Sequence, residues 1–286
     1  MPNSYIDLHS HTTASDGTFT PEELINHAAK IGLSAIAITD HDTIAGLPEA
    51  RDAGRRYGIE IVNGIEFSVG TEIDVHLLGL DFDYDCPSIA NALSGFIDYR
   101  DRHNRRIIEK LNGIGIDISY DEALEYATSS VVGRSQIARV MVKRGYVGTV
   151  ADAFEKYLSP GMPGFVPRDS LTPEKAIEII HASNGIASLA HLNQIKMSED
   201  DKFEFLAHLA ECGLDACEGY YTEYTQEQNV RYRDWAARLG LKLSGGSDFH
   251  GMNKIGHELG NVRIPYEVLK LLRTDNKTNR NTKESP

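Results

Sequence analysis

Histidine and acidic side chains recur where predicted strands end, a placement suited to binding metal ions. His9 and His11 flank one residue at the end of the first predicted strand, so in extended chain their imidazoles point the same way and can hold one cation. The residues that share this placement are His9, His11, His41, His76, His191, His250, Glu66 and Asp248. Polar groups gathered at strand ends are typical of an active site at the top of a β/α barrel.

The alternative is that these histidines are structural. In that case we would expect them to be scattered over helices and solvated faces, as His27, His181, His208 and His257 are predicted to be. Placing so many polar groups beside apolar strands costs desolvation energy unless they share a partner, and metal is the simplest partner. Imidazole mixed with carboxylate, without thiolate, suits zinc, manganese or iron better than calcium or magnesium.

The segments between these motifs alternate between strand and helix patterns. Thr20-Pro21-Glu22-Glu23 offers an N-cap, a proline at the first helical position and a capping box, and residues 34–39 form an apolar run of strand length. Seven strands interleaved with helices predict an α/β fold with a parallel sheet closed into a barrel. The predicted strands are 5–9, 34–39, 60–65, 75–80, 186–190, 215–219 and 241–244, and the helices are 21–31, 45–57, 173–184, 200–211 and 226–239.

The middle of the chain departs from this alternation. Residues 89–158 carry helical periodicity with several glycine stops and no buried-strand pattern, which predicts a helical insertion. We therefore predict a discontinuous barrel over 1–85 and 168–273 and a helical substrate cap over 86–167. Residues 274–286 contain no hydrophobic side chain and are predicted to be a disordered tail.

Net charge and cysteine content argue against several classes of protein. The formal net charge of −13 disfavours binding to duplex DNA, although bound divalent ions would offset part of it. The cysteines Cys86, Cys212 and Cys217 lack the spacing of a disulfide scaffold or a zinc knuckle. No leader pattern or long apolar window occurs, so we expect a cytoplasmic protein without membrane association and without an obligate protein partner.

Several short motifs, taken in order, resemble those of the polymerase-and-histidinol-phosphatase (PHP) phosphoesterases. They are Asp7-Leu8-His9-Ser10-His11-Thr12, Ser15-Asp16-Gly17, Thr39-Asp40-His41-Asp42-Thr43, Gly64-Ile65-Glu66, His76, Ala190-His191 and Gly246-Ser247-Asp248-Phe249-His250. The resemblance covers residues 5 to about 262 and is specific as an ordered set. It implies a distorted (β/α)7 barrel with a trinuclear metal site.

The same resemblance implies ligands for three divalent ions, which would be manganese, iron or zinc. It assigns them as His9, His11, Glu66 and Asp248 for one ion, Glu66, His76 and His191 for the second, and Asp16, His41 and His250 for the third. Residue preferences alone would make Asp16 a turn residue. We interpret Asp40 and Asp42 as groups that orient the ligating histidines or cap a helix.

A cluster of three divalent ions would lower the pKa of a bridging water and neutralise a phosphate, so we expect phosphate-ester hydrolysis by a metal-bridging hydroxide. The chain has neither a nucleophile elbow nor a phosphate-binding glycine loop that would favour another mechanism. The residues predicted to carry the catalysis are Asp248, His250, Glu66 and Asp42. For the leaving group, Asp42, His41 and His250 stay open as proton donors.

The predicted substrate is a small anionic phosphate ester. PHP proteins that act on nucleoside 3′,5′-bisphosphates and short RNA ends look similar in the insertion, with an R-N pair and a G-R-P-H stretch where this chain has His103-Asn104 and Gly133-Arg134-Ser135-Gln136. The resemblance implies removal of the 3′-phosphate of such bisphosphates, with short 5′-phosphorylated RNA as a related substrate. The predicted substrate contacts are Arg134, Ser135, His103, Asn104 and His41.

Three alternatives stay open. A histidinol-phosphate phosphatase would use the same metal site on a smaller substrate. An amidohydrolase cleaving C–N bonds would be expected to have a carbamylated lysine where this chain has Glu66. A metal-binding domain without activity would be expected in a longer chain or with eroded ligands.

Overall fold

The computed structural model describes residues 4–70, 73, 75–126, 132–166 and 171–281. The chain divides into two compact units, the first formed by Met1–Ile89 and Ser170–Pro286 and the second by Ala90–Asp169. The predicted return boundary at 167/168 and residues 282–286 of the predicted tail lie outside the described residues.

The first unit is built on one sheet of eight strands in the order β7-β6-β5-β4-β3-β2-β1-β8. A further hydrogen bond joins strands that are not neighbours in this order. The Leu8 N–H donates to the Gly245 carbonyl at 3.1 Å, which brings the ends of β1 and β7 together. The distorted barrel predicted from the sequence is thus confirmed. The strands are β1 (Tyr5–Asp7), β2 (Leu33–Ile38), β3 (Glu60–Val69), β4 (Val75–Leu80), β5 (Ile186–Leu189), β6 (Ala216–Tyr221), β7 (Lys242–Gly246) and β8 (Ile264–Pro265).

The expectation of a parallel sheet is wrong for β4, and the antiparallel strand β8 was not predicted. β4 runs antiparallel to both β3 and β5, and β8 runs antiparallel to β1. The short connection between Val69 and Val75 leaves no room for a crossover helix, so β3 and β4 must form a hairpin. As a result the start of β4, which carries His76, lies beside the end of β3, with Ser68 opposite His76.

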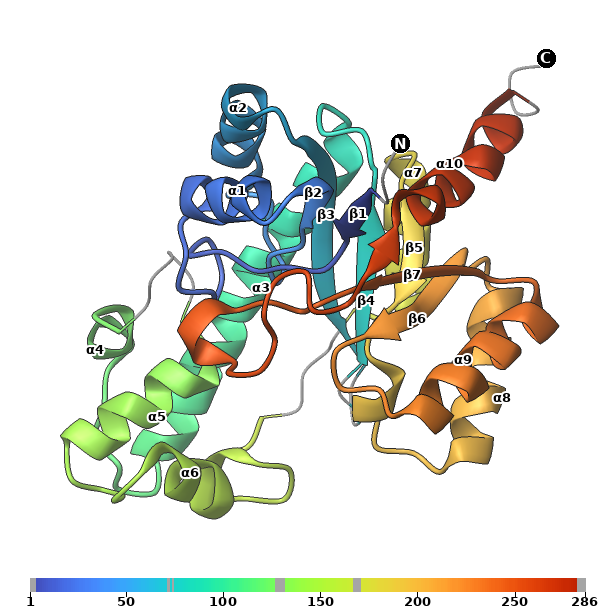
Figure 1. Ribbon diagram of the computed structural model, residues 1–286. Coiled ribbons are helices and arrows are strands. Elements are labelled where there is room, and N and C mark those ends of the chain that lie inside the picture. Colours follow the sequence, from blue (N-terminus) through green and yellow to red (C-terminus); the bar gives the residue numbers. More distant parts are fainter. Residues whose placement is uncertain (1–3, 71–72, 74, 127–131, 167–170, 282–286) are drawn as a thin grey trace. The chain divides into compact units, whose positions relative to one another are not determined.

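Helices cover the outside of this sheet, as Figure 1 shows for α1 and α2 beside β2 and β3 and for α9 beside β6. α1 begins with the predicted capping box of Thr20 and Glu23 and buries Leu24, Ile25 and Ala28 against the sheet side. The helices are α1 (Pro21–Lys30), α2 (Leu47–Tyr57), α7 (Pro173–Ala182), α8 (Glu199–Glu211), α9 (Gln226–Leu239) and α10 (Tyr266–Asn281), with the short turns η2 (Leu192–Gln194) and η3 (Gly251–Asn253).

α10 extends into the segment predicted as a tail from residue 274, and the disorder of that tail stays a prediction. α10 buries Val268, Leu269 and Leu272 and continues to Asn281. Once its first turns are packed, each further residue adds one hydrogen bond to an existing helix, so even polar residues extend it. Among the described residues, none of the helices combines the length and hydropathy that crossing a membrane requires.

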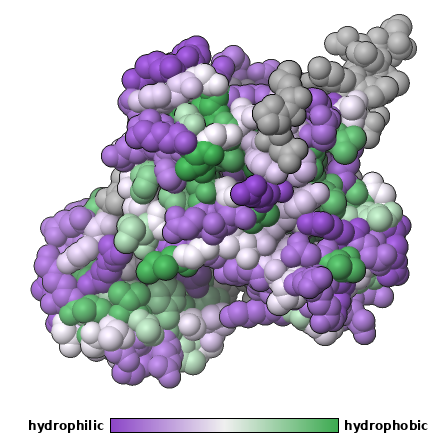
Figure 2. Space-filling model, in the orientation of Figure 1, coloured by the Kyte–Doolittle hydropathy of each residue, from purple (hydrophilic) through white to green (hydrophobic). Residues whose placement is uncertain are grey.

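Apolar side chains of the strands form the core of the first unit. Ile6, Leu8, Ala35, Ala37 and Val62 are fully buried at alternating strand positions. Hydrophilic side chains dominate the outer surface around α1 and α2 in Figure 2. The polar strand ends are the exception to this separation.

The second unit has a core of its own. Apolar residues such as Leu111, Ile137, Val140 and Met141 pack together in it. Its helices are α3 (Pro87–Asn112), α4 (Tyr120–Leu124), α5 (Arg134–Lys143), α6 (Val150–Ala153) and the π-helical turn η1 (Phe154–Leu158).

Candidate metal centre

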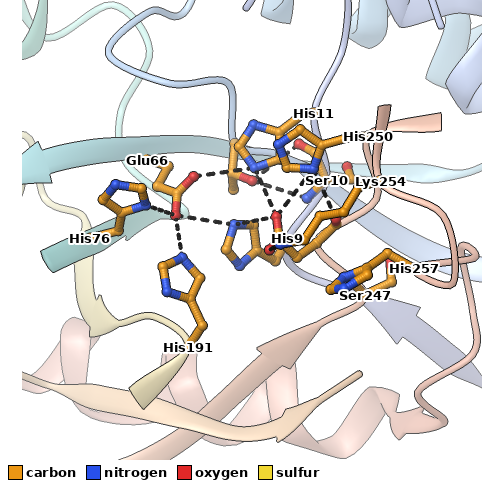
Figure 3. A network of polar contacts seen from close by, with 12 residues as sticks. His9, Ser10, His11, Glu66, His76, His191, Ser247, His250, Lys254 and His257 are labelled. Atoms are coloured by element: carbon orange, nitrogen blue, oxygen red, sulfur yellow. Dashed lines mark hydrogen bonds and ion pairs between the residues drawn. The ribbon is translucent and has the colours of Figure 1, made fainter. Parts of the chain in front are cut away.

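The strand ends carry the predicted ligands into one cluster (Figure 3). Main-chain pairing continues past the strands and places predicted ligands side by side. The Asp248 N–H donates to the His9 carbonyl at 2.9 Å, and the main chain of His41 pairs with that of Glu66. The Ala190 N–H donates to the His76 carbonyl at 3.0 Å, which places His191 beside β4. The barrel closure between β1 and β7 thus brings together residues from opposite ends of the sequence.

Glu66 lies at the centre of the histidines, with its side chain only 1% exposed. Its Oε1 lies 2.9 Å from both His76 Nδ1 and His191 Nε2, contacts drawn in Figure 3. Its Oε2 lies 3.0 Å from His41 Nδ1 and 3.2 Å from His11 Nε2. Burial acts to raise the pKa of Glu66, but the surrounding histidines outweigh burial and hold this pKa well below its usual value.

Asp248 is the second buried carboxylate of the cluster. Its Oδ1 lies 3.3 Å from His11 Nε2, 3.3 Å from His250 Nδ1 and 3.5 Å from His9 Nε2. Burial raises the pKa of Asp248, but His9 and His11 outweigh this and hold it well below the usual value. The two buried carboxylates therefore give the cluster a negative potential, which attracts cations.

Asp16 joins the cluster from its more exposed side. Its carboxylate lies 3.3 Å from His250 Nε2, 3.7 Å from His11 Nδ1 and 3.8 Å from His41 Nε2. The turn that carries Asp16 is closed by the Gly17 N–H donating to the Thr12 carbonyl at 2.9 Å. A Cβ at Gly17 would lie 2.5 Å from the His11 carbonyl oxygen, so glycine is required there.

The donor atoms fit divalent cations. Buried polar atoms in proteins are almost always hydrogen-bonded, yet several here have no partner of suitable geometry among the described residues. The candidate ligand sets have their donor atoms within 4.8 Å of one another, close enough to surround a bound ion. The unpartnered buried atoms are His9 Nε2, His11 Nδ1 and Nε2, His41 Nδ1 and Glu66 Oε2.

Asp42 and Asp40 brace the loops that hold the histidines. Asp42 has a positive φ of 51°, and its Oδ1 accepts the Ser68 N–H at 3.0 Å, which ties the end of β2 to β3. Asp40 accepts the Thr12 N–H at 2.7 Å and the Ser15 hydroxyl at 2.7 Å. Both carboxylates thus position neighbouring segments.

Three functional candidates escaped the sequence reasoning. Glu218 of β6 lies 2.8 Å from His9 Nδ1. The Tyr221 hydroxyl donates to Asp248 Oδ2 at 2.8 Å, and Lys254 Nζ donates to the same oxygen at 2.5 Å. The only sequence signal for Glu218 was a single acid in a strand that is otherwise apolar or small. Lys254 lies in the loop after β7, where a charged residue is unremarkable.

The other predicted substrate contacts lie in the second unit. His103 and Asn104 are buried there, with the His103 Nε2 3.0 Å from the Val166 carbonyl and the Asn104 Nδ2 donating to the Val132 carbonyl at 2.6 Å. Arg134 and the exposed Ser135 begin α5, and the Arg134 guanidinium lies 5.8 Å from the ring centre of Phe154. Their contact with substrate stays a prediction.

Comparison with known proteins identifies the family. The sequence profile of the PHP-domain family matches residues 7–240 of this chain. The chain is 37% identical over 247 residues to the 5′-3′ exoribonuclease Rnm of Salmonella typhimurium, covering 85% of this chain and 84% of that protein. It is 33% identical over 259 residues to the 3′,5′-nucleoside bisphosphate phosphatase of Chromobacterium violaceum, covering 90% and 91%.

A solved structure agrees with these relatives. A protein from Bifidobacterium adolescentis assigned as a metal-dependent phosphoesterase superposes with a TM-score of 0.77 at 29% identity, covering 95% of this chain and 96% of that one. The resemblance inferred from the sequence motifs is confirmed. The strand-end cluster and the family match agree, and the chain belongs to the PHP-domain family.

Proposed function

We propose that this metal-dependent phosphoesterase removes the 3′-phosphate from nucleoside 3′,5′-bisphosphates and also acts on short 5′-phosphorylated RNA. The observation that carries the proposal is the buried Glu66 carboxylate with His11 and His41 beside it, whose facing nitrogens have no hydrogen-bond partner of suitable geometry among the described residues. The chain is also related to a bisphosphate phosphatase and an exoribonuclease. A phosphate ester is the class of substrate that such a cation-binding cluster suits.

The ligand assignment belongs to the same proposal. We assign His9, His11, Glu66 and Asp248 to one ion, Glu66, His76 and His191 to a second, and Asp16, His41 and His250 to a third. The close approach of donor atoms within His9, His11 and Glu66 supports the first set, and that within Asp16, His41 and His250 supports the third. Two further groups, His9 with His191 and Asp248 and His41 with Glu66 and His76, join members of different sets, as expected of ions held side by side. Manganese, iron and zinc all suit mixed imidazole and carboxylate ligands.

Bound divalent ions would neutralise the substrate phosphate and activate water at neutral pH. The residues of this chain set the direction of approach. His9 and His11 are fully buried, whereas Asp16 has 55% of its side chain exposed and His41 has 24%. The phosphate would therefore enter from the side of Asp16 and His41, where His41 would contact it. His41, His250 and Asp42 stay candidates for giving a proton to the leaving oxygen.

The second unit is part of the proposal as the substrate cap. Arg134 and the amides at the start of α5 suit a second phosphate, because a guanidinium and a helix N-terminus both favour anions. His103 and Asn104 would act beside them. The domain boundaries at 86 and 167 and the cytoplasmic location also stay predictions.

The test is phosphate release from adenosine 3′,5′-bisphosphate, histidinol phosphate and a 5′-phosphorylated trinucleotide, with Mn²⁺ added to purified protein. We expect turnover of the bisphosphate and the trinucleotide, lost in Asp248→Asn and retained in the matched surface variant Asp234→Asn. Preference for histidinol phosphate would refute the substrate assignment. Absence of turnover on all three by metal-loaded protein would refute the proposed activity and reopen C–N hydrolysis.

A further inference from the structure

Glu218 stands apart from the predicted ligands because its strand, β6, contributes none of them. Its carboxylate is fully buried, and each of its oxygens contacts a different proposed ligand. Oε1 lies 2.8 Å from His9 Nδ1, and Oε2 accepts the main-chain N–H of His191 at 2.6 Å. One side chain thus connects two ligands that are far apart in sequence.

The contact with His9 determines which ring nitrogen faces the cluster. A carboxylate only accepts hydrogen bonds, so Nδ1 of His9 carries a hydrogen, and a neutral His9 would present the lone pair of Nε2 to a bound ion. Nε2 is the atom that points toward the cluster, 3.4 Å from Glu66 Oε1 and 3.5 Å from Asp248 Oδ1. It is also one of the buried atoms without a hydrogen-bond partner of suitable geometry.

The contact with His191 fixes a strained main chain. His191 has a φ of 25°, in the left-handed region that residues with a Cβ rarely adopt. This conformation turns the ring so that Nε2 lies 2.9 Å from Glu66 Oε1. A short, charge-assisted hydrogen bond from the His191 N–H to Glu218 holds the backbone in it.

The same strand also supports a third ligand. Tyr221, at the end of β6, donates its hydroxyl to Asp248 Oδ2 at 2.8 Å, on the oxygen that faces away from the histidines. β6 pairs with β7 on one side and with β5 on the other, so it lies between the segments that carry Asp248 and His191. The strand is therefore placed to align ligands on both neighbours.

We propose that Glu218 is a positioning residue of the metal centre, which presents His9 Nε2 and the His191 ring to a shared divalent ion cluster. This inference rests on the proposed function. A carboxylate that holds a ligand histidine by its second nitrogen typically raises metal affinity about 10- to 100-fold.

The variant Glu218→Gln tests the proposal, because glutamine keeps the shape but can accept only through one of its two terminal atoms. Either one of the two contacts is lost, or the amide accepts the His191 N–H and donates to His9 Nδ1, which moves the His9 hydrogen to Nε2. We expect about 10- to 100-fold weaker Mn²⁺ binding in a chelator competition. Turnover should recover at high Mn²⁺, and the ¹⁵N shifts of the His9 ring should report a changed tautomer. The matched control is Glu211→Gln, an exposed glutamate at the end of α8.

Each outcome decides between the alternatives. Mn²⁺ binding by Glu218→Gln equal to that of wild type would overturn the role of Glu218 while leaving the phosphoesterase proposal intact. Wild-type protein that binds no divalent ion would overturn both. If Glu218→Gln does not fold, Glu218→Asp replaces it: the shorter carboxylate cannot reach both partners, so unchanged Mn²⁺ affinity there would also reject the proposal.

Discussion

Glu66 is the residue on which the largest number of proposed ligands converge. Its two oxygens face His76 and His191 on one side and His11 and His41 on the other. Glu66→Gln removes the charge that favours cations there, so we expect metal content to fall and turnover to drop by more than about 100-fold, as the loss of several kcal/mol of transition-state stabilisation requires. Elemental analysis of the dialysed protein and phosphate release measure the two effects.

The control for this change is Glu204→Gln, which alters an exposed glutamate of α8. It should leave metal content and turnover unchanged. Full metal content in Glu66→Gln would show that Glu66 is not a ligand.

Residue type and strand-end spacing predicted where most of the cluster lies, because His9, His11 and Asp248 each follow a strand. Glu66 lies inside the second half of β3, which continues past the predicted strand end. Glu218 could not be predicted in the same way. Its partner His9 is 209 residues away, and only the closed sheet brings the two together. A buried acid whose partners are distant has no signature in its own neighbourhood of the sequence.

At the scale of elements, the contact between β7 and the chain after β1 holds the ligands of the N-terminal strands close to Asp248. A Cβ on Gly246 would lie 2.4 Å from both the main-chain nitrogen and the Cβ of His9. We therefore expect Gly246→Ala to separate β1 from β7, to lower the free energy of unfolding by about 1–3 kcal/mol and to weaken metal binding. Urea unfolding of the metal-free protein measures the first effect, and Mn²⁺ titration measures the second.

The matched glycine is Gly95 in α3, where an added Cβ meets nothing within 4 Å. Gly95→Ala should stabilise the protein by up to about 1 kcal/mol, because alanine favours helix over glycine. Equal unfolding midpoints for Gly246→Ala and wild type would show that the close packing of β7 on His9 is unimportant.

Elements with strong local signals were predicted well, and those defined by their connections were not. α1 carries its own start signal in Thr20 and Glu23, and the structure confirms it. The apolar pattern of β4 is the same whether the strand runs parallel or antiparallel, so its direction depended on the short Val69–Val75 connection. β8, with only two residues, has no periodicity to detect.

For the whole molecule, metal binding should be coupled to stability. Ions that bind the folded chain at about 100 times their dissociation constant stabilise it by about 2.7 kcal/mol for each site. For a chain of this size one such site raises the Tm by about 5–10 °C, so the Tm with Mn²⁺ should exceed that with a chelator by at least this amount. Thermal unfolding under both conditions measures the difference.

Asp248→Asn should show a smaller difference in Tm than wild type, since it loses one proposed ligand. A wild-type Tm that does not respond to the chelator would contradict the coupling.

The sequence positions of the clustered residues also bear on how the protein is made. His9 follows β1 and is synthesised long before Asp248, which follows β7, while the close contacts of both form at the same barrel closure. A nascent chain that ends before β7 therefore holds an incomplete set of donors. Retained metal would thus mark a chain that has been synthesised past His250 and has closed the barrel.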